Sequence, residues 1–176
     1  MNSTHPPLGL ALDLSATGLL AGAVVHLAAW LGGPQWMAAL GAPPSIVASA
    51  AIGSWPALLG TLAIAALLVG MALSCFLVAR RRTRLIFLRG TLGIFAVILL
   101  ARGLLVVPFI FAGQRKWRTP AGKIIVTGDW FAAGSLVVLA IGALICLGLY
   151  QTRSERRSLN IVAALPRRTR ARHDTE

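Results

Sequence analysis

Four long apolar runs divide the chain, and each is long enough to cross a bilayer as a helix. They cover about residues 9–31, 57–79, 85–112 and 129–150. A transmembrane helix needs about 20 predominantly apolar residues, and only short polar or proline-rich segments separate these runs. The pattern predicts an all-α fold, an integral membrane four-helix bundle.

The segment between the first two runs, residues 32–56, is uncharged and contains several prolines. Proline breaks regular helix, so the segment is too interrupted to span a membrane, and it is too apolar for an ordinary water-exposed loop. We predict that it lies on or dips into the membrane surface, with a short helix at about residues 45–53. We predict a polar loop at residues 114–128, between the third and fourth spans.

Composition supports a membrane protein without a separate soluble domain. Of the 176 residues, 57% are hydrophobic and 12% are charged, whereas soluble domains carry about 25% charged residues. Four spans use about half of the chain or more. We therefore assign residues 1–152 to the transmembrane domain. Residues 153–176 hold seven arginines and three acidic residues, and we predict a disordered basic tail.

The distribution of basic residues predicts the orientation in the membrane. The formal net charge of +12 comes from residues between and after the spans, so we exclude nucleic-acid binding. An even number of spans places the basic turn at residues 80–84 and the tail on the same side, and basic residues favour the cytoplasmic side. We predict a multi-pass plasma-membrane protein with both termini cytoplasmic. Its partners would be the lipid bilayer and, near the turn and tail, anionic headgroups.

Three ionisable residues fall in the outer halves of the predicted spans: His26, Arg102 and Asp129. An unpaired arginine at the bilayer centre costs at least about 2.5–3.5 kcal/mol, and a long side chain can extend toward the membrane surface. Gly18 and Gly22 mark a packing face, and His26 continues their four-residue spacing, so it should point into the bundle. We predict that the three residues meet as a polar cluster.

This cluster is open to three functional interpretations. In the first, Arg102 binds a small anionic or lipid-headgroup ligand, and His26 exchanges a proton or forms a hydrogen bond. Asp129 then orients the Arg102 or the His26 side chain. In the second, the protein is a membrane enzyme that uses His26 as acid or base. In the third, the cluster only clamps the helices of a structural or partner-binding subunit. The sequence also leaves open a protein partner or a homo-oligomer.

A second pair of charges, Asp13 and Arg89, is predicted near the inner surface. We favour a solvated or structural ion pair there, because both residues are close enough to the headgroups to reach water. Cys75 and Cys146 lie in apolar runs without a CxxC motif or a His/Cys cluster, which gives no support to a redox or zinc site. We predict no cofactor and no metal, and the chain contains no recognisable catalytic motif.

Several of these residues resemble the signature of a known family. His26, Trp30, Gly32 and Gly33 end the first span, Arg102-Gly103 lies in the third, and Asp129 heads the fourth. The pattern resembles the His-x-x-Trp…Gly-Gly signature of a family of small bacterial four-span membrane proteins catalogued as a domain of unknown function. The tryptophan here lies four residues after the histidine rather than three, and the chain lacks the family's Tyr-Ser-Pro after the aspartate, where Ala133-Gly134-Ser135 stands. The resemblance implies a four-span fold in a bacterial inner membrane and a polar trio, but no activity.

Overall fold

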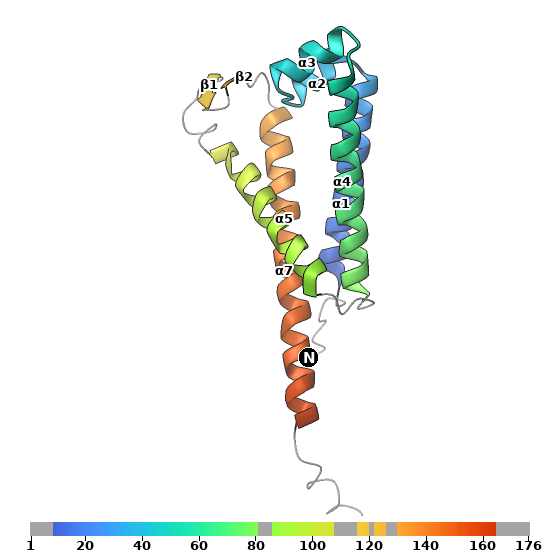
Figure 1. Ribbon diagram of the computed structural model, residues 1–176. Coiled ribbons are helices and arrows are strands. Elements are labelled where there is room, and N and C mark those ends of the chain that lie inside the picture. Colours follow the sequence, from blue (N-terminus) through green and yellow to red (C-terminus); the bar gives the residue numbers. More distant parts are fainter. Residues whose placement is uncertain (1–8, 81–85, 108–115, 120–121, 126–129, 165–176) are drawn as a thin grey trace, which may run out of the picture.

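The computed structural model shows an all-α bundle and confirms the predicted fold (Figure 1). It describes residues 9–80, 86–107, 116–119, 122–125 and 130–164. Its four long helices are α1 (Leu10–Leu31), α4 (Trp55–Ala79), α5 (Ile86–Leu104) and α7 (Trp130–Ala164). Each contains a stretch that is long and apolar enough to cross a membrane. The protein is therefore a multi-pass membrane protein.

The four helices pack as two pairs that share one core. Helix α1 packs mainly on α4, α5 packs mainly on α7, and α1 also contacts α7. The core lies toward the end where α1 begins and α4 ends, and the two pairs diverge toward the opposite end (Figure 1). The largest fully buried side chains of this core are Leu12, Leu19, Cys75, Val78, Leu92 and Ile145.

Glycines set the closest approaches between the helices. A Cβ atom at Gly103 would lie 2.6 Å from Leu139 Cβ and 2.8 Å from Leu139 Cα, so α5 and α7 touch there through their backbones. A Cβ at Gly148 would lie 2.5 Å from Leu12 Cγ, which fixes α7 against α1. Small residues commonly allow such contacts between membrane helices.

Two short helices cap the diverging end of the α1–α4 pair. They are α2 (Pro34–Ala39) and α3 (Pro44–Ala51), and each starts at a proline, which suits the first helical position. Helix α3 confirms the predicted short helix, whereas α2 was not predicted. Met37 is buried with Ala29 and Ala57, and this small cluster packs the cap onto α1 and α4.

Serine hydroxyls connect the cap to the start of α4. The Ser49 hydroxyl lies 2.8 Å from the Ser54 hydroxyl, and the Ala57 backbone N–H donates to Ser49 Oγ at 3.1 Å. The Ser54 hydroxyl donates to the Ser49 carbonyl oxygen at 3.0 Å. The first backbone donors of a helix have no intrahelical partner, so Ser49 stabilises α4 from a different helix.

The structure corrects the sequence prediction in two places. Strands β1 (Lys116–Thr119) and β2 (Gly122–Ile125) form an antiparallel hairpin where a polar loop was predicted, with Lys116 opposite Ile125. Helix α7 continues to Ala164, so the prediction of a disordered tail is wrong for residues 153–164. Residues 165–176 lie outside the described part of the chain.

Candidate functional site

Arg102 lies near the end of α5 and reaches across to α7. Its Nη1 donates a hydrogen bond to Ser135 Oγ over 3.2 Å. Ser135 is buried, with 2% of its surface exposed, whereas the arginine keeps an exposed part. The close backbone contact at Gly103, the next residue, brings α7 near enough for this bond. Ser135 was not predicted as a partner of Arg102.

The Arg102 side chain reaches toward the start of α7. Leu139 lies opposite Gly103, and Ser135 is four residues closer to the start of α7. At 1.5 Å per residue this is about 6 Å along the helix. The guanidinium is therefore displaced along the bundle toward the end that carries α2 and α3, as expected for an arginine that extends toward a membrane surface.

His26 does not point into a packed bundle, and this prediction is corrected. The side chain is exposed, and its Nδ1 donates to the Gly22 carbonyl oxygen of the same helix over 2.8 Å. His26 lies seven residues after Leu19, so the two share a helix face, and Leu19 is fully packed in the core. The two helix pairs diverge toward the end that carries α2 and α3 (Figure 1). His26 lies in the half of α1 that is nearer this end, so the same face is uncovered at His26.

Asp129, the third member of the predicted cluster, lies outside the described residues. It directly precedes Trp130, where α7 begins, and lies six residues before Ser135 in the sequence. The structure thus brings Arg102 to a serine on α7 and leaves His26 on a separate, uncovered helix face. The meeting of all three predicted residues stays a prediction.

Asp13 has an unusual environment near the other end of the bundle. Its Oδ1 atom is buried and has no hydrogen-bond partner within the described ranges. The predicted ion pair between Asp13 and Arg89 stays a prediction. Cys75 is buried in the core, Cys146 is exposed, and neither is in a disulfide.

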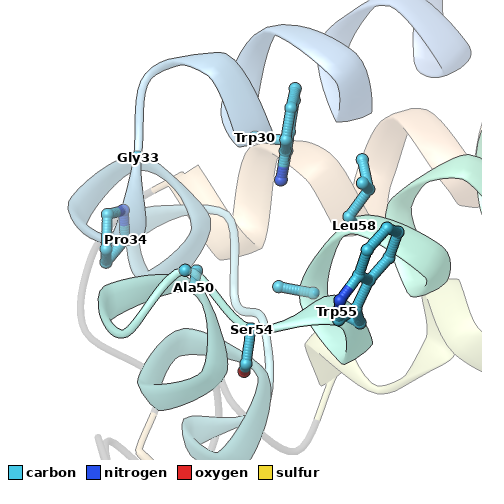
Figure 2. Close-up of a pocket in the computed structure, with 9 residues that line it drawn as sticks. Trp30, Gly33, Pro34, Ala50, Ser54, Trp55 and Leu58 are labelled. Carbon is cyan, nitrogen blue, oxygen red and sulfur yellow. The ribbon is translucent and has the colours of Figure 1, made fainter.

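The structure also contains a cleft that sequence reasoning missed. It has a volume of about 400 Å³ and lies where α1 ends, α2 begins and α3 leads into α4 (Figure 2). Its walls include the indole rings of Trp30 and Trp55, with Gly33, Gly53 and Leu58. The signal was present in the sequence, because Trp30 lies just before the uncharged 32–56 segment and Trp55 lies near its end.

Comparison of the chain with protein-family models, curated protein sequences and solved structures finds no match. The resemblance to the bacterial four-span family therefore stays a prediction. Within the described ranges, no three His, Cys, Asp or Glu side chains come together as candidate metal ligands. Functional inference consequently depends on the residues themselves.

Proposed function

We propose that this plasma-membrane protein binds a small anionic group at Arg102, either free or as part of a lipid headgroup. The observation that supports this is the position of the arginine in a membrane-spanning helix, oriented by a hydrogen bond to the buried Ser135 hydroxyl. Ionisable residues within membrane spans commonly mark functional sites, because their presence there is costly.

The chemistry of the side chain favours an oxyanion. A guanidinium carries five N–H donors in a fixed plane, so it can serve Ser135 and further acceptors together. Two parallel donors match the spacing of two oxygens of a phosphate or a carboxylate. In this proposal Asp129 orients the guanidinium from the start of α7. His26 would join as a hydrogen-bonding or proton-exchanging group when the helix pairs close around the ligand.

A helix clamp is the second candidate, and one observation favours it. The Arg102–Ser135 bond connects α5 to α7 at the level where Gly103 contacts Leu139. Interhelical hydrogen bonds in membrane proteins contribute about 0.6 kcal/mol on average. In this alternative the arginine fixes the register of two helices, and the protein is a structural or partner-binding subunit.

Ligand retention and thermal stability distinguish the two candidates. We would titrate the purified protein in detergent with phosphatidylglycerol, phosphatidylcholine or inorganic phosphate, and follow bound species by native mass spectrometry. We expect the wild type to retain phosphatidylglycerol or phosphate, and Arg102→Gln to lose about tenfold in affinity, or 1.4 kcal/mol. Arg80→Gln is the comparison for loss of a surface charge in the basic turn, because Arg80 is exposed at the end of α4 and contacts the Phe76 ring. Any loss of lipid at Arg80 should disappear in added salt, which screens exposed charges, whereas the loss at Arg102 should persist.

A different result would support the clamp. If the wild type binds neither anion and Arg102→Gln only lowers the unfolding temperature, the proposed site does not exist. Equal retention of phosphatidylglycerol by Arg102→Gln and Arg80→Gln would also reject it. Phosphate binding without lipid binding would identify the free anion as the ligand, and the reverse would identify the headgroup.

A further inference from the structure

The cleft between Trp30 and Trp55 lies at a defined level of the membrane. Trp30 is the residue before the last of α1, and Trp55 is the first residue of α4. Helix α1 has 22 residues, which gives a length of about 33 Å, close to the roughly 30 Å of hydrocarbon in a bilayer. The ends of both helices therefore lie where the hydrocarbon meets the headgroups. Tryptophan is enriched at that level.

The lining of the cleft is uncharged but has two hydrogen-bond donors. Figure 2 shows the indole nitrogens of Trp30 and Trp55 on the cleft side of their rings. An indole N–H can only donate, and no described residue supplies either with an acceptor. The Ser54 hydroxyl, by contrast, already donates to the Ser49 carbonyl oxygen. A matching ligand has an apolar body and acceptor oxygens.

The cleft is also formed before any ligand arrives. The Ser49–Ser54 hydrogen bonds and the Met37 cluster fix α3 and α2 against the ends of α1 and α4. Gly53 has φ +66°, and a Cβ added there would meet no atom within 4 Å. Binding then needs little ordering of the protein, which favours affinity. The empty space beside Gly53 is available to a ligand.

We infer that this cleft binds the glycerol-ester region of a membrane lipid. The ester carbonyl oxygens accept hydrogen bonds from the two indoles, and the start of the acyl chains lies against Leu58 and the aromatic faces. Three features select this ligand: the depth of the cleft, the uncharged lining and the unused indole donors. Because recognition is directed at the esters, the site takes lipids of differing headgroup. The inference does not depend on the Arg102 site.

The test uses an uncharged lipid that the Arg102 site would not select. Dioleoylglycerol is titrated into the full-length protein in detergent, and bound lipid is measured by native mass spectrometry. We expect one molecule to be retained by the wild type. Trp30→Phe and Trp55→Phe keep a ring but remove one donor, and each should weaken retention about tenfold. Gly53→Asn should abolish retention, since asparagine tolerates positive φ and its side chain fills the open space.

Two control variants distinguish a loss of lipid binding at the cleft from a general loss of lipid binding. Trp36→Phe changes an exposed tryptophan of α2 that does not line the cleft, and Gly41→Asn changes another glycine of positive φ, at +84°. Both should retain the lipid, as should Arg102→Gln. Equal retention by Gly53→Asn and Gly41→Asn would overturn the inference. So would an absence of retained lipid in the wild type, or undiminished retention when both Trp30 and Trp55 are phenylalanine.

Discussion

At the scale of single residues, Gly103 occupies a position where α5 has no room for a side chain. A methyl group there would lie 2.8 Å from the backbone nitrogen and Cα of Leu139, and backbone atoms cannot rotate away as a side chain can. We expect Gly103→Ala to lower the free energy of unfolding by about 1–3 kcal/mol through overpacking. Thermal or denaturant unfolding of the wild type and the variant in detergent would measure this change in the free energy of unfolding.

Gly93 offers a matched control on the same helix. A Cβ at Gly93 would meet no atom within 4 Å, and alanine is a better helix former than glycine by about 1 kcal/mol. Gly93→Ala should therefore leave stability unchanged or raise it. If the two variants were equally stable, the close contact between α5 and α7 would be absent from the protein in solution.

The sequence predicted that Arg102 needs a partner, but not which residue supplies it. The cost of a charge in hydrocarbon holds for any packing arrangement, so it predicted a carboxylate or a water-filled cavity beside the arginine, whereas the partner that the structure describes is the Ser135 hydroxyl. The identity of Ser135 depends on the relative axial positions of α5 and α7, which the Gly103–Leu139 contact sets. Periodicity placed His26 on the core face correctly, but it carries no information about where that face stops being covered.

At the scale of elements, the contact of α1 with α7 depends on a glycine and the leucine opposite it. The Gly148→Ala methyl group would lie 2.5 Å from Leu12 Cγ, and Leu12 is fully buried. We expect Gly148→Ala to destabilise the protein by about 1–3 kcal/mol, and Leu12→Ala to do so by about 2–5 kcal/mol. In the double variant the new methyl group occupies vacated space, so the combined loss should be about 1–2 kcal/mol less than the sum.

The control for this double-mutant comparison combines Gly148→Ala with Met37→Ala. Met37 belongs to the separate cluster beneath the cap, so these two effects should add within about 0.5 kcal/mol. Unfolding of all the variants would be compared in one detergent. Simple addition of the Gly148 and Leu12 effects would contradict the contact.

The four spans were predictable as elements because hydrophobic length alone specifies them. Two other elements, the β-hairpin and the extension of α7, could not be predicted from hydrophobic length. The β-hairpin has Trp117 and Thr119 in one strand and two isoleucines in the other, which are residues typical of strands, but a run this short is outweighed by its polar neighbours. The extension of α7 to Ala164 avoids the cost of starting a helix, because adding residues to an existing helix is easier than nucleating one.

At the scale of the whole molecule, the start of α1, the end of α4 and the later part of α7 meet at one end of the bundle. Gly9 lies against Ala79, and Leu12 lies against Gly148. Helices that cross a membrane in alternating directions place the start of the first, the end of the second and the end of the fourth on the same side, as seen here. The side of the membrane on which that end lies is predicted from the basic residues.

Reporter fusions would test this orientation. Alkaline phosphatase fused at Gly41, between α2 and α3, should be active because that end should face away from the cytoplasm. The same enzyme fused after Glu176 should be inactive, and a fluorescent protein should show the reverse pattern. An active phosphatase at the C-terminus would invert the orientation, and with it the predicted outward direction of Arg102.

The length of α7 has a mechanical consequence. The helix continues without interruption from the Arg102–Ser135 bond to Ala164, a distance of about 43 Å at 1.5 Å per residue. It extends well past the ends of the other helices (Figure 1). A tilt of about 5° with its pivot at Ser135 would displace the far end by about 4 Å, by the same helix geometry.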